Sequence, residues 1–231
     1  MTIAYPAAVL WDMDGTLVDT EPYWIRAETE LVDSFGGTWT HEDALGVIGA
    51  GLWTSAKALQ DHGVALDADE IVHTLTARVR EQLTTFGVPW RPGARELLAD
   101  IREAGIPTAL VTMSVRPMAE QIVAEIPFDA FDLLVTGDEV DQPKPHPDAY
   151  LTAASRLGVE PAETIAIEDS VSGLASAIAA GTIAVGVPHI VPLPPGEDRT
   201  IWPTLVGRSV ADLAALARDR GGMTETVGVN G

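Results

Sequence analysis

The stretch that decides the fold is Ala7-Ala8-Val9-Leu10-Trp11, followed directly by Asp12-Met13-Asp14-Gly15-Thr16. A short apolar run bounded by a proline and a glycine is typical of a buried strand. Asp12 and Asp14 therefore follow the carboxyl end of a strand, which is the edge where open parallel sheets bind ligands. Two carboxylates this close repel each other, so burial requires a metal ion or a shared proton. Because an Asp-x-Asp-Gly run is also an ordinary turn, the rest of the chain has to decide between the two interpretations.

The composition favours a cytoplasmic enzyme or binding protein. The chain has 231 residues, enough for one sizeable domain or for a domain with a modest insertion. No apolar run approaches ~20 residues, and the first residues lack a basic stretch and a long apolar core, so we expect neither a membrane span nor a secretory signal. The sequence has no cysteine, which excludes disulfide bonds and cysteine-ligated zinc.

The charge balance restricts the possible partners. There are 34 acidic and 14 basic residues, for a net charge of −20. A surface this acidic repels nucleic acids and anionic lipids, so we expect no nucleic-acid partner and no membrane partner. We also expect a monomer. An anionic substrate would need local positive charge, and Lys57 and Lys144 are the only lysines in the chain.

A block of helical patterns follows the first strand. Apolar residues recur at helical spacing throughout it, and no convincing strand appears before Phe86. The predicted helices are Glu21–Phe35, His41–Val47, Leu52–His62 and Ala68–Thr84. The spacing thus predicts a helical insertion of residues 20–87.

From Pro92 onward, strands and helices alternate. The predicted strands are Pro107–Thr112, Phe131–Val135, Thr164–Glu168 and Ile183–Val187. This alternation predicts an α/β fold, a Rossmann-like parallel sheet with helices on both faces and an inserted helical cap domain. We expect the core domain in residues 1–19 and 88–220 and the cap in residues 20–87. We also expect a loop at Pro188–Pro203, a last helix near Val210–Arg218 and a mobile tail at residues 221–231.

Three further motifs lie at predicted strand ends or before predicted helices. They are Leu110-Val111-Thr112-Met113-Ser114, Lys144-Pro145-His146-Pro147 and Ile167-Glu168-Asp169-Ser170. Together with the Asp12 motif they resemble, in order, the four signatures of the haloacid-dehalogenase-like (HAD) superfamily, over roughly residues 7–187. The helical insertion is similar to the small cap of the subfamily that holds β-phosphoglucomutase and many sugar-phosphate phosphatases. The resemblance implies a phosphatase that acts on a small phosphorylated metabolite of the sugar or polyol phosphate type.

The two acids of the first motif suit phosphoryl transfer, which needs an in-line nucleophile and a proton for the leaving oxygen. We expect Asp12 to be the nucleophile and to form an aspartyl-phosphate. Asp14 would protonate the leaving group and then activate the water that cleaves the intermediate.

A magnesium site is expected beside these acids, because Mg²⁺ prefers oxygen ligands and often binds one or two carboxylates with a substrate phosphate. Asp12 and Asp169 are the expected side-chain ligands. The resemblance implies that Asp14 contributes its backbone carbonyl. Glu168 is either an additional ligand or a group behind the ligands, and acids at a helix start also favour the helix dipole without any metal.

Four residues are expected to contact the substrate phosphate. Lys144 would screen the nucleophile from the phosphoryl charge, and the prolines beside it favour a fixed backbone. Thr112 would donate its hydroxyl to a phosphoryl oxygen, helped by N–H groups of the following loop. Met113 keeps its N–H but offers no polar side chain to the substrate. Ser114 either binds phosphate or caps the next helix.

Specificity is expected from the cap, since its face would close over the site. The candidates are Glu21, Trp24, Arg26, Trp53 and Lys57. For the tryptophans a place in the core, and for Arg26 a place on a solvated face, are the alternatives.

Three other functions remain to be weighed. A β-phosphoglucomutase-like isomerase would share the nucleophile, but its resemblance implies a histidine in the first cap helix, and none occurs between Asp19 and Thr40. Dehalogenation needs neither a magnesium site nor a second acid. A catalytically idle Mg²⁺-binding protein would not need the second acid of the pair Asp12 and Asp14. We therefore expect hydrolysis.

Overall fold

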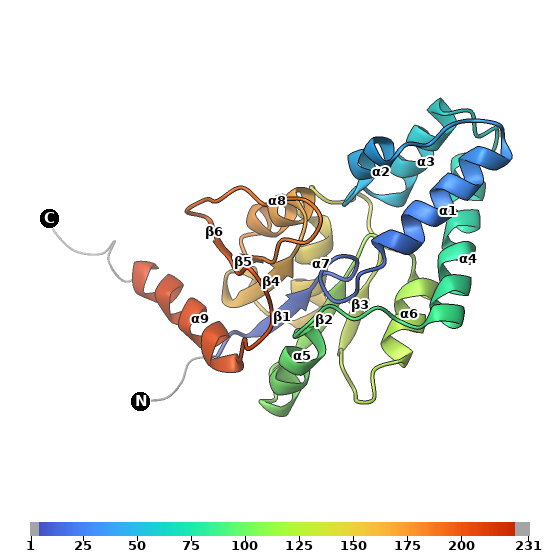
Figure 1. The fold of residues 1–231 in the computed structure, drawn as a ribbon. Helices are drawn as coiled ribbons and strands as arrows, with labels where there is room; N and C mark the ends of the chain where they lie inside the picture. Colours follow the sequence, from blue (N-terminus) through green and yellow to red (C-terminus); the bar gives the residue numbers. More distant parts are fainter. Residues whose placement is uncertain (1–4, 225–231) are drawn as a thin grey trace, which may run out of the picture.

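A parallel sheet forms the centre of the molecule (Figure 1). The computed structural model describes residues 5–224. Within these residues the sheet has six strands in the order β3-β2-β1-β4-β5-β6, and every neighbouring pair is parallel. The strands are β1 (Ala8–Trp11), β2 (Thr108–Val111), β3 (Leu133–Val135), β4 (Thr164–Glu168), β5 (Ile183–Gly186) and β6 (Arg199–Ile201). The α/β fold class expected from the sequence is thus confirmed.

Helices cover both faces of this sheet. They are α5 (Ala94–Glu103), α6 (Arg116–Ala124), α7 (Asp148–Leu157), α8 (Val171–Ala179) and α9 (Val210–Thr224), with a 3₁₀ turn at Pro161–Glu163. Val9 and Trp11 of β1 belong to the apolar cluster that includes residues of α5, α6 and α9. Ala8 and Leu10 belong to the cluster that includes residues of α7 and α8. Because successive side chains of a strand point to opposite faces, a strand buried on both faces has to be apolar throughout.

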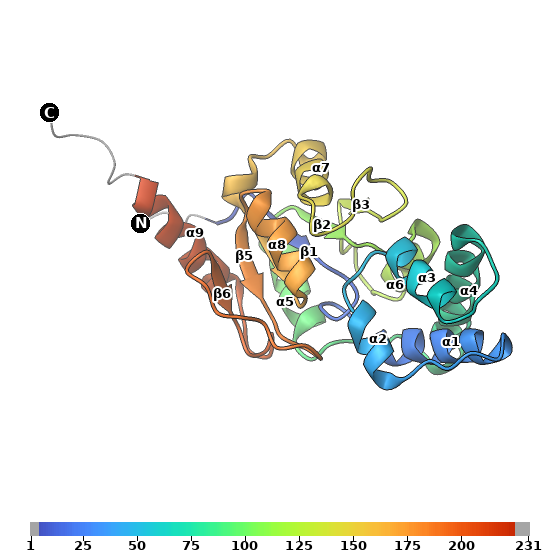
Figure 2. The same ribbon diagram turned by 90° about the horizontal axis from the view of Figure 1, so that it is seen from above.

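Four further helices lie together at one end of the sheet, on the side toward which β1 runs (Figures 1 and 2). They are α1 (Glu21–Ser34), α2 (His41–Val47), α3 (Leu52–Asp61) and α4 (Ala68–Phe86). Helices α2 and α4 begin at capping boxes whose first residues are Thr40 and Asp67, so their start points are encoded locally. Helix α4 packs against both α1 and α3.

The two chain segments that join this helical group to the rest run side by side. The N–H of Asp19 donates to the carbonyl of Pro89 at 2.7 Å, and the N–H of Arg91 donates to the carbonyl of Leu17 at 3.0 Å. Between them, Val18 and Trp90 form an isolated antiparallel bridge. The division into a core and a cap domain, with boundaries at these segments, stays a prediction.

The structure corrects the expectation for the C-terminal third in two places. Residues 199–201 form the edge strand β6, where the sequence predicts only a loop. Thr200 pairs with Val185, and a strand this short in a proline-rich segment is tolerated because an edge strand pairs on one side only. Helix α9 continues through Thr224, beyond its predicted end near Arg218, and the mobility expected of residues 221–224 stays a prediction. The rest of the expected mobile tail, residues 225–231, lies outside the described residues.

No helix among the residues that the structure describes combines the length and the apolar character needed to cross a membrane.

Candidate active site

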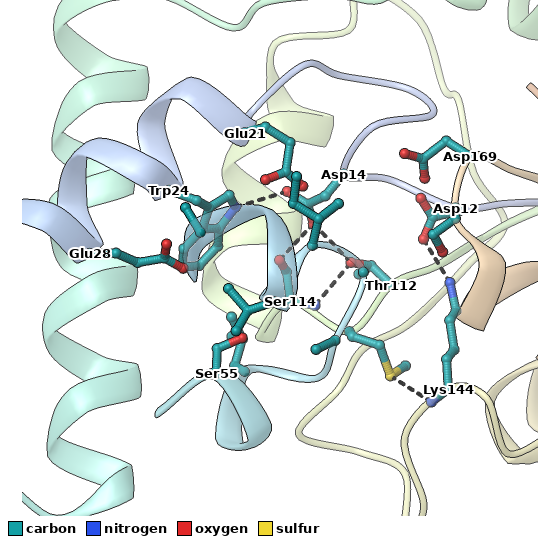
Figure 3. A pocket seen from close by; sticks show the side chains of 18 residues that line it. Asp12, Asp14, Glu21, Trp24, Glu28, Ser55, Thr112, Ser114, Lys144 and Asp169 are labelled. Atoms are coloured by element: carbon teal, nitrogen blue, oxygen red, sulfur yellow. Dashed lines mark hydrogen bonds and ion pairs between the residues drawn. The ribbon is translucent and has the colours of Figure 1, made fainter. Parts of the chain in front are cut away.

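The carboxyl ends of the central strands bring the motifs together. Asp12 follows β1, Thr112 follows β2, and Asp169 follows β4. Sheet pairing continues into these ends, because the N–H of Asp12 donates to the carbonyl of Ile167 at 3.0 Å. Figure 3 shows the resulting pocket, with the carboxylates of Asp12 and Asp169 side by side.

Three buried carboxylates form the floor of this site. One carboxylate oxygen from each of Asp12, Glu168 and Asp169 lies within 4.8 Å of the others. Oδ2 of Asp12 is fully buried and has no hydrogen-bond partner among the described residues. Burial raises the pKa of Asp12 to about 7, and the charge of Glu168 adds to this rise. Burial, followed by the charge of Asp12, also raises the pKa of Asp169 well above its usual value.

Gly15 allows the carboxylate of Asp169 to lie close to the loop after β1. Gly15 has φ +87°, and a Cβ placed on it would lie 2.0 Å from Oδ2 of Asp169. Only a residue without a side chain leaves room for that carboxylate. The hydroxyl of Thr16, next in the chain, donates to Oδ1 of Asp169 at 3.4 Å.

The donor set of the floor fits a hard divalent cation. Mg²⁺ binds carboxylate oxygens and retains several waters, so it needs few protein ligands. The carboxylates of Asp12 and Asp169 lie close together, and a cation between them would offset the burial and the mutual repulsion that raise the pKa values of both. The buried acidic cluster can therefore hold a metal ion.

Lys144 lies between two of the acids. Its Nζ is 2.6 Å from Oδ1 of Asp12 and 2.7 Å from Oε1 of Glu168, and it also donates to the carbonyl of Val111 at 2.8 Å. Burial lowers the pKa of Lys144, but the charges of the two carboxylates outweigh burial and hold the pKa above its usual value. The lysine is thus a fixed cation rather than a solvated loop residue.

Sequence reasoning missed Tyr150, which contacts both Glu168 and Lys144. Its hydroxyl donates to Oε1 of Glu168 at 2.6 Å, and Lys144 Nζ lies 5.1 Å from the centre of its ring. Tyr150 lies in the first turn of α7, the helix that follows Lys144. The sequence signal that could have found it is a phenol in the first turn of that helix, close in sequence to the lysine.

Asp14 is held by hydrogen bonds from both sides of the pocket. Its Oδ1 accepts from the hydroxyl of Thr20 and, at 3.3 Å, from the indole Nε1 of Trp24. Its Oδ2 accepts from the hydroxyls of Ser114 at 2.7 Å and of Thr112 at 3.3 Å. The Asp14 side chain therefore faces the pocket, separate from the acidic floor (Figure 3).

The loop after β2 lies beside Asp14. Thr112 Oγ1 accepts from the N–H of Ser114 at 3.0 Å, which fixes the turn. Ser114 does not cap α6, whose N-cap is Val115 and has no side-chain cap. Met113 lines the pocket, and its sulfur contacts the N–H of Lys144 at 3.3 Å.

The cap candidates divide into two groups. Glu21 and Trp24 line the pocket with Asp12 and Asp14. Arg26, Trp53 and Lys57 do not line it: all three are exposed, with Arg26 paired to a neighbouring glutamate and Trp53 bonded to an aspartate of α4.

Two pocket residues on the cap side, Glu28 and Ser55, were missed by the sequence analysis. Burial raises the pKa of Glu28 to about 7 and that of Glu21 to about 8, and the charge of Asp14 adds to the rise for Glu21. Nothing in the sequence marks Glu28 or Ser55, because each reads as an ordinary polar residue on a helix.

Comparisons with known proteins agree with this arrangement. Residues 6–181 match the family model described as haloacid dehalogenase-like hydrolase. The chain is 31% identical to hexitol phosphatase B of Escherichia coli O157:H7 over 216 residues, which cover 90% of this chain and 94% of that protein. It is 32% identical to fructose-1-phosphate phosphatase YqaB of E. coli K12, over 78% of this chain and 96% of that protein. The crystal structure of CbbY from Rhodobacter sphaeroides in complex with phosphate superimposes with a TM-score of 0.82 and 28% identity, covering 90% of this chain and 99% of that one.

Proposed function

Because the chain belongs to the haloacid dehalogenase-like hydrolases and is a phosphatase of that family, we propose that it hydrolyses a small sugar or polyol phosphate with Mg²⁺, through a phosphorylated Asp12. The named activities of the hexitol and fructose-1-phosphate phosphatases support this substrate class. A cytoplasmic location and a monomeric state stay predictions from the sequence.

The observation that carries the proposal is the free Oδ2 of Asp12. This oxygen is buried and has no hydrogen-bond partner in the described residues, while Oδ1 accepts from Lys144 at 2.6 Å. One oxygen of the carboxylate is thus fixed and the other is left for attack on phosphorus. Oδ2 attacks in line and forms the acyl-phosphate as the ester oxygen departs.

Positive charge is needed around this nucleophile, since a carboxylate and a phosphate repel each other. Lys144 supplies one fixed cation. The side chains of Asp12 and Asp169, with the backbone carbonyl of Asp14, would hold Mg²⁺, which neutralises phosphoryl oxygens when it is bound. Glu168 is either a further ligand or the residue that positions Lys144.

Asp14 serves as acid and then as base. Its carboxyl group is separate from the floor and receives four side-chain hydrogen bonds, from Thr20, Trp24, Thr112 and Ser114. In the first step it gives its proton to the leaving alcohol oxygen, and in the second it takes a proton from the water that attacks the acyl-phosphate. The hydroxyl of Thr112 and the N–H group of Met113 bind the phosphoryl oxygens.

Water is excluded from the first step by the helical group. We propose that residues 20–87 act as a cap domain on a core of residues 1–19 and 88–220, and that the paired segments at Asp19 and Pro89 act as the hinge. Opening would admit the substrate, and closing would bring the cap wall against the alcohol part of the substrate.

A phosphate-release screen tests the proposal. The purified full chain is assayed with Mg²⁺ against sugar, polyol, glycolate and nucleotide phosphates, with an isomerisation assay on glucose 1-phosphate alongside. We expect the highest kcat/KM for a sugar or polyol phosphate and no isomerised product. Conversion of glucose 1-phosphate to its isomer at a rate above phosphate release would contradict hydrolysis, and absence of phosphate release from all classes would contradict the function.

A further inference from the structure

The cap wall of the pocket carries three buried polar side chains that catalysis does not use. Glu21 and Glu28 come from α1, and Ser55 comes from α3. Their exposed fractions are 9%, 5% and 5%. All three line the same pocket as Asp12 and Asp14; in Figure 3, Glu28 and Ser55 lie across the pocket from the acidic floor, and Glu21 lies beside Asp14.

These groups lack the partners that buried polar groups usually have. Among the residues that the structure describes, the carboxylate of Glu21 and the hydroxyl of Ser55 make no hydrogen bond. Glu28 accepts from Trp39 Nε1 through Oε2 at 3.2 Å, which leaves Oε1 free. Their free oxygens are accessible from the pocket, so a ligand bound there can become their partner.

The spacing of the two acids gives the length of that ligand. Glu21 and Glu28 stand about two turns apart on one face of α1, or roughly 10 Å along the helix axis. A single ammonium group cannot contact both carboxylates. A carbon chain that bears several hydroxyl groups can, and Ser55 can both donate to and accept from such a chain. The apolar side chains of Val47 and Ile48 line the same pocket and suit its C–H groups.

In the part of the chain that the structure describes, the pocket offers no free cation that could bind a second anionic group of the substrate. Of the described residues that line the pocket, Lys144 is the single cation, and it is already paired with Asp12 and Glu168. The cationic cap candidates Arg26 and Lys57 are exposed outside the pocket. A second phosphate or a carboxylate on the substrate would lose its hydration here without gaining a positive partner.

We propose that Glu21, Glu28 and Ser55 bind the hydroxyl groups of the alcohol part of the substrate, and that they select a neutral polyhydroxyl monophosphate over an ester with a second anionic group. This inference rests on the proposed phosphatase function. It adds the residues that determine specificity and the chemistry that they reject.

The wild-type chain provides the first test. We measure kcat/KM for phosphate release from a hexitol 6-phosphate, from fructose 1,6-bisphosphate, from phosphoethanolamine and from 4-nitrophenyl phosphate, which has no hydroxyl groups. The hexitol phosphate should exceed the bisphosphate by at least about tenfold, the factor expected for one or two hydrogen bonds to charged groups. A larger kcat/KM for the bisphosphate overturns the exclusion of anions, and a larger value for phosphoethanolamine overturns the choice of hydroxyl groups.

Glu28→Gln provides the sharper test, because Trp39 fixes the orientation of the new amide. The indole N–H requires an oxygen acceptor, so the amide NH₂ has to face the pocket where Oε1 was. In assays above pH 8, where the Glu28 carboxyl is ionised, an acceptor thus becomes a donor. The ratio of kcat/KM for the hexitol phosphate over the bisphosphate should fall by about tenfold, mainly through a higher KM for the hexitol ester.

Two further variants show whether a changed ratio comes from the pocket or from a general loss of folded protein. Ser55→Ala should lower the ratio of kcat/KM for the hexitol phosphate over 4-nitrophenyl phosphate by about threefold to tenfold. Glu30→Gln is the matched control, because Glu30 lies on α1 but is exposed and paired with Arg26. If Glu28→Gln and Ser55→Ala leave these ratios at the value of Glu30→Gln while phosphate is still released, the inference is wrong and the phosphatase function stands. If no ester releases phosphate in any form of the chain, the function itself fails.

Discussion

Nζ of Lys144 lies 2.7 Å from Oε1 of Glu168 and only slightly closer, at 2.6 Å, to Oδ1 of Asp12. One buried lysine therefore joins Asp12, the proposed nucleophile, to an acid of the neighbouring strand β4. Glu168 also accepts from Tyr150 through the same oxygen, so its Oε1 is already occupied. Its Oε2 has a single long contact, 3.4 Å from Ser170 Oγ, and remains available to a metal.

The two possible roles of Glu168 are separated by titration with Mg²⁺. Asp169→Asn removes a proposed ligand and should raise the Mg²⁺ concentration for half-maximal phosphate release by about tenfold or more. Glu168→Gln should mainly lower kcat, with a smaller change in the Mg²⁺ requirement, because it loosens Lys144. The measurement is phosphate release at a series of Mg²⁺ concentrations. An equal increase in the Mg²⁺ requirement in both variants would make Glu168 a ligand, and full activity of the wild type after chelation would contradict a metal requirement.

Asp12→Asn tests the nucleophile. The amide keeps the shape of the side chain but removes the attacking oxygen, so phosphate release should fall by about 10⁴-fold or more. Circular dichroism and a cooperative thermal transition should show a folded protein, because the loss of one buried charge relieves repulsion with Glu168 and Asp169. Phosphate release at the wild-type rate from this variant would refute the assignment.

The fold was predictable where local pattern and tertiary environment agree. β1 and β4 are buried on both faces, and their continuous apolar runs mark them in the sequence. β6 was missed, because its residues Arg199–Ile201 are only half-buried and carry no apolar run. An edge strand of this kind is defined by its pairing with β5, which a local pattern does not contain.

The acidic residues of the site were predictable from the sequence, but the polar residues on the cap side were not. Asp12, Asp14 and Asp169 follow strands and stand in recognisable motifs, so topology alone brings them together. Glu28 and Ser55 come from two different cap helices, and only the packing of α3 and α1 over the sheet edge places them in the pocket. The helical pattern marks the apolar face of a helix, so it does not show which polar residues reach a pocket through tertiary packing.

Asp14→Asn separates the two chemical steps. 4-Nitrophenol leaves without help from an acid, so the variant should still form the acyl-phosphate with 4-nitrophenyl phosphate and then resolve it slowly. Rapid mixing should show a burst of nitrophenol of about one equivalent followed by a slow steady state. With an alkyl phosphate the same variant should be slow from the start. Hydrolysis of the alkyl ester at the normal rate would exclude Asp14 as the acid.

Gly15→Ala tests the close approach of Asp169 to the loop after β1. A Cβ would lie 2.0 Å from Oδ2 of Asp169, so the carboxylate has to move and the Mg²⁺ requirement should rise. Gly105→Ala is the matched control, because Gly105 also has a positive φ, +70°, but nothing lies within 4 Å of its Cβ position. Both variants should lose about 1 kcal/mol of unfolding free energy from backbone strain, but only Gly15→Ala should change the Mg²⁺ requirement. Equal Mg²⁺ titrations for the two variants would contradict the proposed role of Asp169.

Glu28→Gln should change how stability depends on pH. Burial raises the pKa of Glu28 from 4.5 to about 7, so the folded chain keeps a proton that the unfolded chain loses between these pH values. The wild type is therefore destabilised as pH rises through this window, by an amount on the order of 3 kcal/mol, and it is unaffected by Glu28 below pH 4.5. The uncharged amide can still accept from Trp39. The unfolding free energy of the variant, relative to that of the wild type, should therefore increase from pH 4.5 to 7 and stay constant above pH 7. Urea unfolding at pH 4, 6 and 8 measures this difference, with the exposed Glu30→Gln as control. If the difference in unfolding free energy between Glu28→Gln and the wild type is the same at all three pH values, the carboxyl group of Glu28 titrates normally.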